Sequence, residues 1–146
     1  MTRIVCIGNR HHPMDDTGPR LYRLLQAGVL PPGVELIDGG LNGLNLLRCL
    51  EGADRVVFVD NVSGFAEPGE VVVLDREEGA DASSLAYGHA SGLAYLLRVF
   101  PAVCDSPAPE VRIVGIEAPA EAAAISAAAE FVLRLAIETP MHGGAR

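Results

Sequence analysis

Short strand-like runs alternate with helix-like stretches along the whole chain, and this alternation constrains the fold more than any other feature. Apolar runs rich in β-branched residues, typical of buried strands, occupy residues 4–7, 34–37, 56–59 and 111–116. Apolar residues at helical spacing occupy residues 19–27, 44–50, 89–100 and 121–137. This order predicts an α/β fold in three layers, with helices on both faces of a mixed, mostly parallel, five-stranded twisted sheet.

The fifth strand is expected at residues 71–74, after a turn marked by Pro68 and Gly69. About ten residues separate it from the strand before it, too few for a helical crossover, so we expect it to run antiparallel beside that strand. The polar segment 76–84 predicts a mobile surface loop. No repeat or linker interrupts the chain, so residues 1–139 are expected to form a single domain, with 140–146 as a flexible C-terminal tail.

Composition excludes several classes of function. Hydrophobic residues make up 49% of the chain, but no run approaches the ~20 apolar residues that a bilayer span needs. The start of the chain has no basic segment followed by a long apolar one, so we expect no signal peptide and a cytoplasmic protein. The net charge of −8, without clustered cations, disfavours nucleic acid as a partner. All eleven basic residues are arginine, which excludes mechanisms that need a lysine nucleophile, Schiff base or phosphate-loop lysine.

The cysteines do not form a recognisable site. Cys6, Cys49 and Cys104 are widely separated and include no CxxC pair. This spacing argues against a disulfide framework and against a thiolate zinc site. We expect all three to be small buried apolar residues.

Three polar residues are expected at the edge of the sheet where an open α/β fold binds its ligand, near the point at which the strand order reverses. Asp15 lies in the long loop after the first strand, Asp60 ends the third strand, and His89 begins a helix. A helix N-terminus favours a neutral imidazole, which can bind a metal. Two carboxylates and one imidazole suit a divalent transition ion such as nickel, manganese or zinc.

Each of these residues also has an ordinary structural interpretation. An aspartate after a strand is often a turn or helix cap, and an acidic pair before a helix is typical of a helix N-terminus. A histidine at the start of a helix can also act only as a cap. The prediction of a site therefore depends on the three residues meeting at one edge of the sheet.

Several short motifs appear in the order found in the hydrogenase maturation endopeptidases. The chain resembles this family in Gly8-Asn9 followed by Asp15-Asp16-Thr17-Gly18-Pro19, in Asp38-Gly39-Gly40, in the strand ending at Asp60, in Glu67-Pro68-Gly69-Glu70, in His89-Ala90-Ser91-Gly92-Leu93, and in residues 114–119. The resemblance covers about residues 3–135.

The resemblance implies an enzyme that removes a C-terminal extension from the large-subunit precursor of a nickel–iron hydrogenase after nickel insertion. In the family an acid, an aspartate and a histidine contact the nickel that the substrate carries. By position these are Asp15, Asp60 and His89. The resemblance thus implies nickel as part of the substrate, no organic cofactor, and the precursor as partner, and we expect a monomer.

The chain departs from the family pattern in the first loop. The family usually has two acids ending at the metal-binding one, whereas here Met14 precedes Asp15, and Asp16 stands where glycine is common. Asp16 is therefore the alternative to Asp15. Leu41-Asn42 also replaces the threonine that commonly follows this Asp-Gly-Gly.

Other residues near the predicted site have open roles. His11 and His12 are either solvent-facing or an auxiliary contact to metal or peptide. Tyr87 is either an anchor for its own loop or part of a peptide groove. His142, in the tail, is expected to have no role.

Two mechanisms and three rival functions stay open. The metal would polarise the scissile carbonyl or activate a water, or Asp15 or Asp60 would act as general base. A signalling receiver domain is disfavoured because Glu117 stands where receivers have lysine, and a dinucleotide-binding fold because G-x-G-x-x-G is absent. A non-catalytic chaperone for the metal-loaded subunit and a generic divalent-metal hydrolase are the remaining alternatives.

Overall fold

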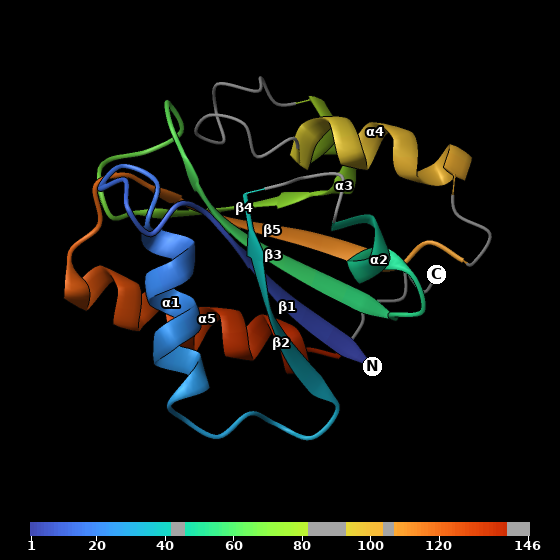
Figure 1. The fold of residues 1–146 in the computed structure, drawn as a ribbon, viewed down its shortest axis with the longest axis horizontal. Coiled ribbons are helices and arrows are strands. Elements are labelled where there is room, and N and C mark those ends of the chain that lie inside the picture. The colour runs from blue at the N-terminus through green and yellow to red at the C-terminus, as the bar shows by residue number, and fades with distance from the viewer. Residues whose placement is uncertain (42–45, 82–92, 104–106, 140–146) are drawn as a thin grey trace.

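The computed structural model describes residues 1–41, 46–81, 93–103 and 107–139 and contains one five-stranded sheet (Figure 1). The strands are β1 (Thr2–Ile7), β2 (Val34–Gly40), β3 (Arg55–Val62), β4 (Val71–Asp75) and β5 (Glu110–Glu117). The helices are α1 (Thr17–Gln26), α2 (Leu47–Leu50), α3 (Arg76–Asp81), α4 (Leu93–Val103) and α5 (Ala122–Ile137). The strand order is β2-β1-β3-β5-β4. The predicted α/β class is confirmed.

The sheet is parallel except for β4, which runs antiparallel to β5. The prediction that β4 is antiparallel is confirmed, but the prediction that it lies beside β3 is wrong. All eight residues of β3 are buried, so β3 needs a neighbour on each side, and β1 and β5 take these positions. β4 is only half-buried, which suits the edge of the sheet.

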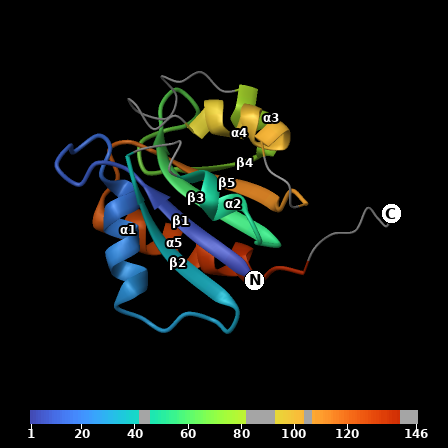
Figure 2. The same ribbon diagram turned by 45° about the vertical axis from the view of Figure 1, so that its right-hand side comes forward.

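Helices cover both faces of the sheet, as predicted. α1 and α5 pack on one face, and α2, α3 and α4 lie on the other (Figures 1 and 2). Alternate residues of β3 divide between two apolar cores: Val57 and Val59 face α1 and α5, whereas Val56, Phe58 and Val62 face the opposite layer. The alternation of β3 side chains therefore decides which layer each site residue meets.

The segment 76–84, expected to be a loop, begins instead with helix α3. Asp75 and Glu78 form a reciprocal capping box in which each backbone N–H donates to the other residue's carboxylate, at 2.9 and 2.8 Å. This arrangement satisfies two N–H groups that a helix start leaves free. The rest of the segment, 82–84, lies outside the described residues.

The remaining elements agree with expectation to within a few residues. α1 begins two residues earlier than predicted, and α4 extends three residues past Phe100 to Val103. Cys6 and Cys49 are buried and free, as predicted, whereas Cys104 and the tail 140–146 lie outside the described residues. Among the described helices, none has the length and apolarity to cross a membrane.

Candidate functional site

The two predicted aspartates lie where the strand order reverses. From β1 the chain passes through α1 to β2 on one side, and β3 lies on the other side of β1. β1 pairs with β3 only as far as Cys6 and Val59, so the two strands are no longer paired beyond these residues. Open α/β sheets bind ligands at such a point. Asp15 follows β1, and Asp60 lies on β3.

Asp60 lies within β3 rather than at its end, because the strand continues for two more residues beside β5. Its alternation with Phe58 and Val62 places it toward the layer of α2 and α4. The side chain is completely buried. Its Oδ1 accepts a hydrogen bond from the Asn61 N–H at 2.8 Å, and its buried Oδ2 has no hydrogen-bond partner among the described residues.

Asp15 is held by the loop that joins β1 to α1. Its carbonyl accepts a hydrogen bond from the Asn9 N–H at 2.7 Å, and its own N–H donates to the His12 carbonyl at 2.9 Å. A Cβ on Gly8 would lie 2.5 Å from the Asp15 carbonyl oxygen, so only glycine fits there. The loop thereby folds back on β1, and the Asp15 side chain is 3% exposed.

The electrostatic environment of Asp60 is unfavourable for its charge. Burial and the nearby charge of Asp15 raise the pKa of Asp60 well above the ordinary 3.8, and the Asn61 hydrogen bond opposes this only partly. Two buried carboxylates therefore lie close enough to repel one another, with little solvent around them. A divalent cation would relieve both the repulsion and the loss of solvation.

Asp16, the alternative to Asp15, lies beside Arg20 of α1. Its carboxylate lies 3.7 Å from the Arg20 guanidinium, one turn along α1, and is partly exposed. It makes no capping hydrogen bond to α1. The geometry thus favours Asp15 as the partner of Asp60.

His89 and Tyr87 lie outside the described residues, so the third predicted ligand is not placed. The helix that follows it, α4, packs on the face toward which Asp60 lies, and Leu93 at its start is fully buried in that core. The described part of the chain contains no cluster of three or more potential metal ligands. The structure therefore brings together two of the three predicted residues.

Sequence reasoning missed Asn61, whose buried side chain joins three elements of the site. Its Oδ1 accepts from the Thr17 N–H at 3.1 Å, and its Nδ2 donates to Thr17 Oγ1 at 2.8 Å and to the Ile116 carbonyl at 3.0 Å. The only signal in the sequence is an amide directly after a strand aspartate, which is equally typical of a turn.

Glu117 holds the segment that follows β3. Its carboxylate accepts hydrogen bonds from the N–H groups of Gly64, Phe65 and Ala66, at 3.0 to 3.1 Å. The N–H of Gly69 donates to the Glu117 carbonyl at 2.8 Å. The buried carboxylate of Glu117 thus accepts the hydrogen bonds that water would otherwise accept from the N–H groups of residues 64–66.

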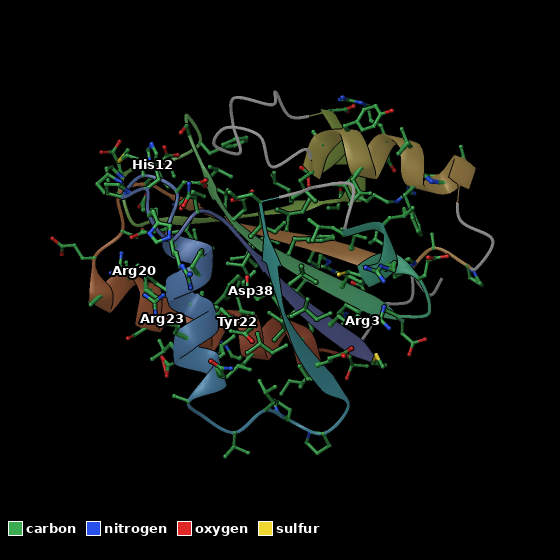
Figure 3. All side chains as sticks on the ribbon, in the orientation of Figure 1. Arg3, His12, Arg20, Tyr22, Arg23 and Asp38 are labelled. Atoms are coloured by element: carbon green, nitrogen blue, oxygen red, sulfur yellow. The ribbon has the colours of Figure 1, made fainter. Side chains whose placement is uncertain are left out.

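A hollow of about 350 Å³ opens on the other side of the first loop. Its lining residues come from the first loop, the start of α1 and the end of β2: Gly8, Asn9, Arg10, His11, Pro19, Asp38, Gly40 and Leu41. His11 is exposed, whereas His12 is half-buried, and Figure 3 shows His12 in the loop that leads into α1. The hollow therefore carries both a basic side and an acidic one.

A protein-family comparison identifies the chain independently of the site. The model of the HycI hydrogenase maturation protease family matches residues 19–139. This range contains Asp60 and His89, whereas the loop with Asp15 precedes it. No curated protein matches the chain.

Solved structures named as maturation endopeptidases share the fold. HybD from Escherichia coli superposes with a TM-score of 0.69 at 23% identity, over 92% of this chain and 88% of that one. HybD from Thermococcus kodakarensis gives 0.68 at 20% identity, over 92% and 95%. The hydrogenase 2 maturation peptidase from a Thaumarchaeota archaeon gives 0.64 at 25% identity, over 92% and 96%.

Proposed function

The chain belongs to the hydrogenase maturation protease family, and from that premise we propose that it is a cytoplasmic endopeptidase that acts as a monomer. Its substrate is the large-subunit precursor of a nickel–iron hydrogenase, from which it removes the C-terminal extension after nickel insertion. Nickel reaches the site as part of the substrate.

The observation that supports this proposal most is the buried carboxylate of Asp60 beside Asp15. A buried, solvent-free carboxylate next to a second acid is costly unless it binds a cation or proton. Neither an arginine ion pair nor a second hydrogen bond to Oδ2 compensates it among the described residues. Oxygen ligands together with an imidazole suit a divalent transition ion such as nickel.

Asp15, Asp60 and His89 would contact the nickel of the bound precursor. Bound nickel supplies a recognition mark and a Lewis acid for the scissile carbonyl. Because burial and the charge of Asp15 raise the pKa of Asp60, a cation bound between the two acids would favour the ionised carboxylate.

The hollow beside the first loop would take the peptide next to the cleavage point. It lies against Gly8 and Asn9, the residues whose backbone packs against Asp15. A peptide bound there would lie beside the loop that holds Asp15. The opposite charges of Arg10 and Asp38 suit a polar segment.

Co-expression with the hydrogenase precursor, with and without nickel, tests the proposal. The C-terminal mass of the precursor is measured for the wild type and for Asp60→Asn and His89→Ala, with Glu121→Gln on the surface as control. We expect shortening that requires nickel, persists in the control and is lost in both site variants while they stay folded.

Three other outcomes would reject the proposal. A stable complex with a full-length precursor would identify a chaperone that binds the metal-loaded subunit without cutting it. Cleavage that proceeds equally without nickel would remove the metal from the mechanism, and a tightly bound ion in the purified protein would point to a generic metal hydrolase.

A further inference from the structure

We propose that Asn61 and Thr17 form a clamp that fixes Asp15 relative to Asp60, so that Asn61 is a positioning residue of the site. The inference rests on the proposed function only in the experiments that measure cleavage of the precursor. The clamp itself is a property of the free protein.

The clamp joins two residues through two complementary hydrogen bonds. Asn61 Oδ1 accepts from the Thr17 N–H at 3.1 Å, while Asn61 Nδ2 donates to Thr17 Oγ1 at 2.8 Å. Both residues are at most 2% exposed. The second Nδ2 hydrogen donates to the Ile116 carbonyl on β5 at 3.0 Å, which fixes the amide plane. Such a buried and satisfied group has one orientation.

Asn61 also performs the capping that Asp16 does not. Thr17 is the first residue of α1, where the backbone N–H has no partner within the helix. The N-cap residue Asp16 makes no side-chain hydrogen bond to the helix, and its carboxylate lies toward Arg20 instead. The start of α1 is therefore anchored to β3, forty-four residues away in sequence.

The clamp acts on both carboxylates through very short stretches of backbone. Asp15 lies two residues before Thr17, and Asp60 lies one residue before Asn61. The bonds of Asp15 to Asn9 and His12 lie within the first loop, whereas the clamp connects that loop to the strand that carries Asp60. A shift of the clamp thus changes the separation of the two acids directly.

Asn61 is not itself placed to bind the metal. Its oxygen and both of its amide hydrogens are already engaged, and alternation along β3 points it toward α1, away from the face of Asp60. Its contribution to the site is geometric.

Thr17→Val and Thr17→Ser form the sharpest test, because they remove and retain the hydroxyl with little change in volume. With nickel-loaded precursor as substrate, we expect Thr17→Val and Asn61→Ala to lower kcat by about tenfold or more, as loss of an outer partner of a metal ligand does, with KM nearly unchanged. Thr17→Ser should stay within about twofold of the wild type, and adding Thr17→Val to Asn61→Ala should cost little more.

Arg55→Met is the matched control for a merely structural effect. Arg55 is also a buried polar residue of β3, but it lies at the opposite end of the strand, where it donates to the Leu135 carbonyl at 2.7 Å. This variant should lose thermal stability comparably and keep its kcat. Equal kcat for Asn61→Ala and Arg55→Met would overturn the positioning role.

Amide hydrogen exchange of the free protein tests the clamp without cleavage. We expect exchange at the Thr17 N–H to be at least about tenfold faster in Asn61→Ala than in Arg55→Met, because the clamp bond is lost only in the former. Unchanged exchange would overturn the clamp. Failure of the wild type to cut any precursor would reject the proposed function, and the exchange result would still decide the clamp.

Discussion

At the scale of single residues, the buried carboxylate of Asp60 suits the binding of a cation but lowers the stability of the free protein. Every residue of β3 is buried, and in such a strand an apolar side chain at position 60 would fill the space without loss of solvation. Asp60 instead places a carboxylate there, next to Asp15, with its Oδ2 lacking a hydrogen-bond partner in the described structure. Such strain is typical of sites that bind a cation.

Asp60→Asn should therefore stabilise the free protein at neutral pH, by about 1 kcal/mol, because it removes the buried charge and keeps an oxygen for the Asn61 N–H. The folded pKa of Asp60 is raised, so between the ordinary 3.8 and that raised value the native state binds more protons than the unfolded chain. The free energy of unfolding of the wild type then falls as pH rises through this window.

Urea unfolding of both proteins at several pH values measures this difference. The advantage of Asp60→Asn should be largest at neutral pH and should shrink as the pH falls, vanishing only well below 3.8, where Asp60 is protonated in both the folded and the unfolded wild type. A variant less stable than the wild type at neutral pH would contradict the electrostatic account.

Asp15→Asn and Asp16→Asn should differ sharply in cleavage. Loss of Asp15, whose charge acts on Asp60, should lower precursor processing by about 100-fold or more, since even outer partners of metal ligands are worth about 10- to 100-fold. Asp16→Asn removes only a partly exposed ion pair with Arg20, worth at most about 1 kcal/mol. Processing rates from intact-protein mass spectra decide between them, and the reverse order would assign the site to Asp16.

The two aspartates of the site were predictable from the sequence, but Asn61, which fixes their relative positions, was not. Asp60 stands out because it is a charge directly after an apolar run, and Asp15 because it belongs to an acidic pair just before a helix. Asn61 has no such contrast with its surroundings, and its partner Thr17 is forty-four positions away. Contacts between residues far apart in the sequence depend on which strands become neighbours in the sheet. Local periodicity does not predict the order of the strands.

At the scale of elements, the same limit explains what was predicted wrongly. The four parallel strands were predictable from their apolar runs, which are most continuous in the three central strands because these are covered on both faces. The position of β4 was not predictable, because it depends on which strand is left with a free edge. Here β5 occupies the place beside β3, so β4 pairs with β5. The polarity of residues 76–84 hid α3, although Asp75 and Glu78 have the three-residue spacing of a capping box.

Asp75→Ala should consequently destabilise the protein by about 1 kcal/mol, because the Glu78 N–H loses its acceptor at the start of α3. Asp75→Asn retains an oxygen at the same place and is the matched control, with a loss of a few tenths of a kcal/mol. Thermal unfolding of the three proteins measures the difference. Equal losses in the two variants would show that the cap contributes nothing to stability.

At the scale of the whole molecule, the two apolar cores share the central strands, so neither can open without exposing the other. Cys6 lies on β1 in the core beneath α1 and α5 and is 1% exposed, whereas Cys49 on α2 belongs to the opposite core and is 9% exposed. Cys6 therefore reports on unfolding of the entire sheet, and Cys49 on smaller openings at its edge.

In a Cys104→Ser background, Cys6 should react with iodoacetamide at least about 1,000-fold more slowly in the native protein than in urea, because reaction waits for global unfolding. Cys49 should react faster than Cys6.

Burial raises the pKa of the Cys6 thiol above the ordinary 9.0, so above about pH 9 the unfolded chain loses its thiol proton first and the free energy of unfolding falls. At high pH, the protection of Cys6 from iodoacetamide should decrease as this free energy of unfolding falls. At neutral pH, Asp60→Asn should increase the protection. Fast reaction of Cys6 in the native protein would show that the sheet opens locally around β1.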